Sequence, residues 1–198
     1  MTKLDDELRG LIEARRISEA TTLVLRELGP EILGFLSGVL GDHVGDEVFS
    51  EFSVALWRSL ETFRSQCAIR TWGYMLARQA IVHYQRSERR HVAGRLPISA
   101  FAEVLEEVRK TRTTLAAERR GQLTRLRKEL STEDCALLIL RVDRALPFED
   151  IAIAFAEDEA ALDDVALRRE AARLRKRFQL IKERLVNLVR TPPPEPVT

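Results

Sequence analysis

The chain has 198 residues, of which 45% are hydrophobic and 32% are charged, and its formal net charge is +1. This hydrophobic content is sufficient for a folded core and excludes an intrinsically disordered protein. Because the net charge is close to zero, a polyanionic partner would have to bind a part of the chain that is locally basic.

Apolar residues recur at helical spacing along most of the chain, and no alternating run bounded by turn residues predicts a strand. We therefore expect an all-α protein with two small helical domains joined by a linker. A short amphipathic helix is expected within residues 1–17. Ser18 is a candidate cap for a second helix, which Gly29 and Pro30 should end before another runs over residues 31–40. A further helix is predicted over residues 46–60.

Residues 72–90 form the helix with the most distinctive pattern in the first domain, which we place at residues 18–90. One side of this helix is apolar, and the other side carries Arg78, Gln79, Arg86 and Arg89. Met75 and Val82 interrupt the basic side. A cationic face interleaved with apolar and aromatic groups suits a phosphate backbone beside unstacked bases.

Residues 91–122 change in character, because Gly94 and Pro97 break any continuous helix. We interpret them as a linker that contains one short helix, capped by Ser99, with apolar residues at 101, 104, 105 and 108. The second domain is predicted at residues 123–190. The proline-rich residues 191–198 are predicted to be a disordered tail.

The second domain contains three predicted helices. Ser131 should cap the first, over residues 133–142, and Pro147 suits the start of the next, over residues 148–156. Asp163 or Asp164 should cap a long final helix. The apolar residues of that helix alternate spacings of three and four, so dimerisation through a coiled coil remains an alternative use of its apolar stripe.

Positive charge is concentrated in two blocks, at residues 57–95 and 165–190. Two separated basic blocks suggest two contact points on one long polyanion, although solvated helix faces would show the same composition. A short helix, a turn and a longer basic helix in the second domain also match the helix-turn-helix arrangement. Its groove-side candidates are Arg168, Arg169, Arg173 and Lys176.

Catalysis finds little support in the sequence. The three histidines and the two cysteines, Cys67 and Cys135, do not have metal-ligand spacing, and we expect no enzymatic activity, no metal and no cofactor. The two distant cysteines fit a reducing compartment. The N-terminus does not resemble a signal peptide and no apolar run could span a bilayer, so a cytoplasmic protein without membrane insertion is expected.

Two stretches resemble a known family. Residues 42–90, DHVGDEVFSEFSVALWRSLETFRSQCAIRTWGYMLARQAIVHYQRSERR, are similar to region two of the extracytoplasmic-function sigma factors of bacterial RNA polymerase. There, EVF, LWR, FR, a TW that heads a helix and a closing arginine cluster recur in this order. LSTEDCALLILRVDRALPFEDIAIAFA followed by ARLRKRFQLIKERL resembles region four of the same sigma-70 family.

The resemblance implies a sigma factor that binds RNA polymerase core, recognises the minus-ten and minus-thirty-five elements of promoter DNA and promotes transcription initiation. The residues implied to bind core polymerase are Val48, Phe49, Phe52 and Trp57. Those implied at the minus-ten element are Phe63, Arg64, Arg70, Trp72, Arg78, Gln79, His83, Arg86, Arg89 and Arg90. Those implied at the minus-thirty-five element are Arg168, Arg169, Arg173, Arg175 and Lys176. An anti-sigma factor is a possible further partner.

Some positions depart from the family pattern or stay open. Gln79 and His83 stand where the family often has asparagine and aspartate, so the recognised bases cannot be copied from relatives. Spacing alone leaves Trp57 between a partner anchor and the margin of the core. Two other functions remain as alternatives: a dimeric helix-turn-helix regulator that acts without polymerase, and an adaptor whose basic faces bind acidic proteins.

Overall fold

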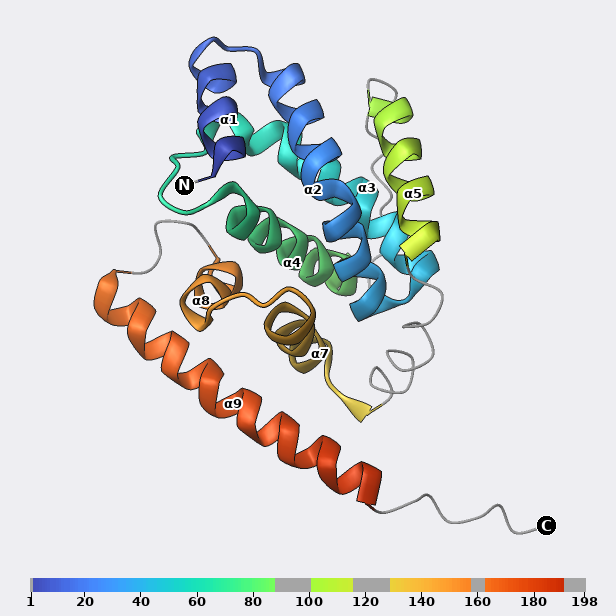
Figure 1. Cartoon of the computed structure of the whole chain (residues 1–198), viewed down its shortest axis with the longest axis vertical. Helices are drawn as coiled ribbons and strands as arrows, with labels where there is room; N and C mark the ends of the chain where they lie inside the picture. Colours follow the sequence, from blue (N-terminus) through green and yellow to red (C-terminus); the bar gives the residue numbers. More distant parts are fainter. Residues whose placement is uncertain (1, 88–100, 116–128, 158–162, 191–198) are drawn as a thin grey trace, which may run out of the picture.

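The computed structural model describes residues 2–87, 101–115, 129–157 and 163–190, and all regular elements in these ranges are helical (Figure 1). The prediction of an all-α fold is confirmed. The elements in chain order are α1 (Lys3–Glu13), α2 (Ile17–Leu40), α3 (Asp42–Ser59), η1 (Leu60–Thr62), α4 (Ile69–Ser87), α5 (Ala102–Leu115), α7 (Thr132–Leu138), η3 (Ile139–Asp143), α8 (Phe148–Phe155) and α9 (Asp164–Arg190).

Helix α2 shows that the boundary predicted at Gly29 and Pro30 is wrong, because α2 continues through both residues. Proline inside a helix removes one backbone hydrogen bond and costs about 3 kcal/mol. Apolar side chains on both sides of Pro30 are fully or almost fully buried, among them Leu25, Ile32 and Leu33. Burial of each such side chain contributes about 1.5–3 kcal/mol, which outweighs the cost of the proline.

The connection between α2 and α3 is a single residue, Gly41, whose φ of 94° favours glycine. Helix α3 therefore begins at Asp42, four residues before the predicted start, and includes Gly45. A Cβ atom on Gly45 would lie 2.7 Å from the Cα atom of Ser37. The absence of a side chain at Gly45 thus allows α2 and α3 to pack closely at their shared end.

The N-terminal helix α1 is fixed to α4 by Asp5. The Asp5 Oδ1 atom accepts a hydrogen bond of 2.9 Å from the backbone N–H of Ile69, the first residue of α4, and Oδ2 accepts one of 2.7 Å from the N–H of Thr2. Burial opposes ionisation of this carboxyl, but the hydrogen bonds from Ile69 and Thr2 outweigh it and lower the pKa of Asp5. Asp5 thus caps a helix that begins 64 residues further along the chain.

Replacement of Asp5 with alanine is expected to lower the free energy of unfolding by about 1–2 kcal/mol, because the buried N–H of Ile69 loses its acceptor. The matched control is Asp6→Ala, which removes an exposed carboxylate from the same turn of α1 and should change stability by about 0.5 kcal/mol or less. Since the pKa of Asp5 is lowered, the difference from wild type should be full at neutral pH. It should decline as the pH falls below 3.8, the ordinary value for an aspartate. Urea unfolding followed by circular dichroism measures both effects.

The predicted linker contains a helix, as expected, but this helix is longer than predicted and belongs to the core. Val104, Leu105 and Val108 of α5 are buried, and α5 packs against α2. Val108 lies so close to Gly29 that a Cβ atom on Gly29 would be 2.8 Å from Val108 Cγ2. The cap predicted at Ser99 lies outside the described residues.

The predicted features of the second domain are largely confirmed. The Ser131 hydroxyl accepts a hydrogen bond of 3.1 Å from the N–H of Asp134, Pro147 precedes α8, and Asp163 accepts one of 2.7 Å from the N–H of Ala166 at the start of α9. The apolar stripe of α9 packs against α7 and α8 of the same chain, with Leu174 and Ile181 buried. Around Leu174 and Ile181, the apolar stripe is therefore covered without dimerisation through a coiled coil.

The buried apolar residues of both predicted domains belong to one hydrophobic core. Helix α4 lies at its centre, because α4 contacts α2 and α3 from the first half of the chain and α8 from the second half. Figure 1 shows α7 and α8 between α4 and α9. This placement determines which faces of the basic helices are accessible.

Candidate nucleic-acid interface

Helix α4 is apolar on two sides, whereas the sequence predicts one apolar side and one basic side. Trp72, Tyr74 and Met75 are all buried, with exposed fractions of 4% or less. Met75, one of the two residues that interrupt the predicted basic side, therefore belongs to a second packing surface of the helix. Helix α4 contacts α2 and α3 and also α8. The side of α4 expected to be open for DNA is thus partly covered within the chain.

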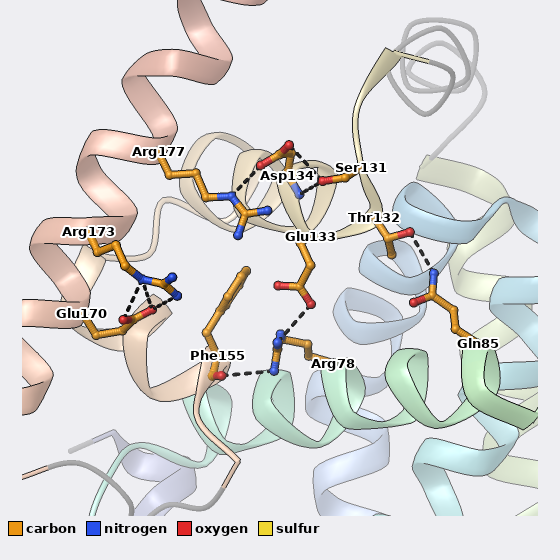
Figure 2. A network of polar contacts seen from close by, with 10 residues as sticks. All are labelled: Arg78, Gln85, Ser131, Thr132, Glu133, Asp134, Phe155, Glu170, Arg173 and Arg177. Atoms are coloured by element: carbon orange, nitrogen blue, oxygen red, sulfur yellow. Dashed lines mark hydrogen bonds and ion pairs between the residues drawn. The ribbon is translucent and has the colours of Figure 1, made fainter.

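Arg78 and Gln79, both predicted at the minus-ten element, contact the second half of the chain, and Figure 2 shows the contacts of Arg78. Arg78 Nη2 donates a hydrogen bond of 3.0 Å to Glu133 Oε1 on α7, and Nη1 donates one of 3.1 Å to the carbonyl of Phe155 at the end of α8. The Arg78 guanidinium also lies 4.7 Å from the centre of the Phe155 ring. Gln79 donates a hydrogen bond of 2.7 Å to the carbonyl of Glu157.

Two further contacts hold α4 in place, one to α7 and one to α2 and the residue after η3. Gln85 Nε2 donates a hydrogen bond of 2.8 Å to Thr132 Oγ1, as Figure 2 shows. At the other end of α4, Arg70 donates hydrogen bonds to the Glu31 carboxylate on α2 and to the carbonyl of Arg144, which follows η3. Arg144 in turn donates to the backbone carbonyl of Glu31, at 3.1 Å. Arg70, a third predicted DNA contact, is therefore also engaged within the chain.

The Glu31 carboxylate is the centre of the hydrogen-bonded group formed with Arg70 and Tyr74. One oxygen, Oε1, accepts hydrogen bonds from Arg70 and from the hydroxyl of the buried Tyr74. Burial raises the pKa of Glu31, but the hydrogen bonds from Arg70 and Tyr74 outweigh burial, so the pKa lies below its ordinary value. Burial and the neighbouring Glu31 charge raise the pKa of the Tyr74 hydroxyl, which therefore stays protonated and donates.

The other described residues predicted at the minus-ten element lie in two environments. Phe63 and Trp72 pack together with ring centres 4.8 Å apart, which places Trp72 in the core. Arg64, Arg86 and His83 are exposed, and His83 Nδ1 lies 3.6 Å from Glu51 Oε2. Arg89 and Arg90 lie outside the described residues.

The residues predicted to bind core polymerase separate into buried and exposed groups. Val48, Phe49 and Phe52 are at most 1% exposed and form part of the core, so they present no surface to a partner in this structure. Trp57, on the same helix, is 40% exposed. An exposed tryptophan on a helix is a typical anchor for a protein partner.

Helix α9 carries the residues predicted at the minus-thirty-five element, and all of them are exposed: Arg168, Arg169, Arg173, Arg175 and Lys176. Arg173 is held by Glu170 on the same helix through hydrogen bonds of 2.7–3.1 Å, and these raise the pKa of Arg173 further. Arg175 lies over the Phe148 ring of α8, 5.1 Å from its centre. Arg169 and Lys176, two turns apart, share one exposed side of the helix.

Glu31, Glu133 and Arg144 are the structural residues that sequence reasoning did not identify. Their partners lie between 39 and 113 residues away, so no local pattern connects them. The sequence signal that could have indicated these distant contacts is Met75, because an apolar residue on a basic helix face indicates a second packing partner.

In the described part of the chain, no helix is long and apolar enough to cross a membrane.

Comparison with known proteins supports the resemblance to sigma region two noted for the first half of the chain. Residues 24–91 match the family model of sigma-70 region 2, a region of transcription factors rather than of enzymes. The match covers most of α2, all of α3 and all of α4, and it amounts to less than half of the chain. Searches of curated proteins and of solved structures find no match. The matched region supports membership of the sigma-70 family and a role in promoter recognition and transcription initiation.

Proposed function

We propose that this chain is a sigma factor of the extracytoplasmic-function type, which acts in the bacterial cytoplasm. It binds RNA polymerase core through the exposed side of α3 around Trp57. It then recognises the minus-ten element through α4 and the preceding loop, and the minus-thirty-five element through α9. An anti-sigma factor remains a possible further partner.

The observation that carries this proposal is the sigma-70 region 2 match over residues 24–91. The matched segment includes α4, whose Arg78 and Gln79 are the groups proposed to meet promoter DNA. The second half adds α8 and α9, a short helix and a long basic helix that pack together as in a helix-turn-helix unit. A protein with both units could bridge two promoter elements.

Run-off transcription with purified core polymerase and a library of genomic fragments tests the proposal. We expect transcripts with defined start sites that appear only when the protein is added. Core polymerase alone is the control. A failure to bind core polymerase at low salt, together with random start sites, would contradict the proposed function.

Substitution of Arg169 by alanine should weaken binding of the full chain to duplex promoter DNA by about tenfold. A specific arginine contact to a base edge is worth about 1–3 kcal/mol. The matched control is Arg26→Ala, which removes the same charge from an exposed position on α2. Fluorescence anisotropy at a fixed salt concentration measures both, since salt alone changes such affinities strongly. Equal losses for the two variants would indicate a nonspecific charge effect.

A further inference from the structure

His83 of α4 and Glu51 of α3 form a pair where these two helices pack together. His83 Nδ1 lies 3.6 Å from Glu51 Oε2, and the His83 side chain is 74% exposed. Within the described residues, Glu51 Oε2 is buried and accepts no hydrogen bond. A buried carboxylate oxygen without a donor is costly, so this oxygen favours an N–H group at Nδ1 of the neighbouring ring.

The contact with Glu51 determines which ring nitrogen of His83 carries the proton. A neutral imidazole has one N–H donor and one acceptor nitrogen. A shift of the exposed ring by about 0.5 Å brings Nδ1 and Glu51 Oε2 within the ordinary N–H···O range of about 2.7–3.2 Å. With the proton held at Nδ1, the Nε2 atom is left as an acceptor.

His83 lies on the side of α4 that carries other predicted DNA contacts. It follows Gln79 by four residues and precedes Arg86 by three, so the three side chains share one side of the helix. Arg86 is exposed and suits a phosphate, a contact that positions a protein on DNA without reading the sequence. The uncharged ring of His83 beside it is suited to a base edge instead.

We propose that Glu51 is a positioning residue that makes His83 a hydrogen-bond acceptor toward promoter DNA. The base groups that fit an acceptor are the exocyclic amines of adenine and cytosine, whereas thymine O4 and guanine O6 are acceptors themselves. Glu51 and His83 together therefore select adenine or cytosine at the base that His83 meets. This inference rests on the proposed function, because it assigns a base preference to the helix proposed to read the minus-ten element.

The first test measures the tautomer of His83 in the free, full-length chain. Nitrogen NMR of protein with isotope-labelled histidine distinguishes a protonated ring nitrogen from an unprotonated one, and His83→Gln identifies the His83 signals. At about pH 8, where histidine side chains are ordinarily neutral, we expect the proton at Nδ1 in wild type. Glu51→Ala should shift it toward Nε2. The matched control Glu47→Ala, which removes an exposed carboxylate one turn earlier on α3, should leave the tautomer unchanged.

The second test measures base preference in transcription by the full chain with core polymerase. The templates are randomised over the minus-ten element, and the transcripts are sequenced. At one position, wild type should favour adenine or cytosine over guanine or thymine by about fivefold, the effect of one hydrogen bond. His83→Ala and Glu51→Ala should each lower this ratio to about twofold or less. Since the ratio compares templates within one reaction, a general loss of activity or stability does not change it.

The outcomes separate this inference from the proposed function. If the His83 proton lies at Nε2 in wild type, or stays at Nδ1 in Glu51→Ala, Glu51 does not position the ring and the inference is wrong. If either alanine variant keeps the wild-type base ratio at every position, the inference is also contradicted. If wild type has the expected tautomer but yields no specific transcripts, the proposed function itself fails, and the base preference fails with it.

Discussion

The substitution Glu31→Gln is expected to lower the free energy of unfolding by about 2–3 kcal/mol. The Glu31 carboxylate accepts hydrogen bonds from Arg70 and Tyr74, and only 24% of its side chain is exposed. A neutral amide cannot balance the charge of Arg70, and its N–H group would face other donors. The loss should therefore exceed that of an ordinary surface ion pair.

The matched control is Glu19→Gln on the same helix. Glu19 also accepts two hydrogen bonds from one arginine, Arg16, but both side chains are more than half exposed. Exposed pairs contribute about 0–1 kcal/mol, so this variant should be close to wild type. Urea unfolding of the three proteins at pH 7 gives the comparison. If Glu31→Gln lowers the free energy of unfolding no more than Glu19→Gln does, the Glu31 hydrogen bonds do not stabilise the fold as predicted.

The Glu31 effect should also depend on pH. The pKa of Glu31 is lower in the folded chain than its ordinary value of 4.5. The ionised carboxylate therefore contributes its full stabilisation above pH 4.5, and this contribution is lost as the pH falls through the folded pKa. The difference between wild type and Glu31→Gln should shrink at acidic pH, and unfolding curves at pH 7 and pH 4 measure the change.

Replacement of Trp57 by alanine should weaken binding to core polymerase by about thirtyfold, which corresponds to about 2 kcal/mol. Trp57 is the large apolar side chain exposed on α3, whereas Val48, Phe49 and Phe52 are buried in the core. The binding energy predicted for this helix should therefore reside mainly in Trp57. Since Trp57 contributes little to the core, the fold should be retained.

The control is Val142→Ala, which removes an apolar side chain that is 59% exposed in η3, away from α3. Binding to immobilised core polymerase measures both variants, and duplex DNA binding by the free proteins shows whether α9 is intact. We expect only Trp57→Ala to affect polymerase binding. Equal affinities of the two variants would remove Trp57 from the proposed interface.

Features that depend on neighbouring residues could be predicted from the sequence. The caps at Ser131 and Asp163 and the start of α8 after Pro147 are local, and all three are confirmed. The continuation of α2 through Pro30 could not be predicted in this way, because burial of side chains against distant helices outweighs a local preference.

The candidate site depends still more on distant contacts. The basic residues of α4 were identified from spacing, but their engagement by Glu133 and by the end of α8 joins residues at least 55 positions apart. Charge and spacing predict which residues share a helix face. Which helix packs on that face depends on how the whole chain folds. The residues predicted at the minus-thirty-five element are all exposed on α9, and their role at promoter DNA stays a prediction.

The central position of α4 has a consequence for synthesis of the protein on the ribosome. Helix α4 ends at Ser87, whereas the end of α8, which covers it, is at Phe155. At about 5–20 residues per second, the covering residues follow roughly 3–14 s after α4 is complete. During that interval the Met75 side of the nascent helix has no partner from the second half of the chain. An apolar helix side without its partner exposes the growing polypeptide to aggregation and to capture by chaperones.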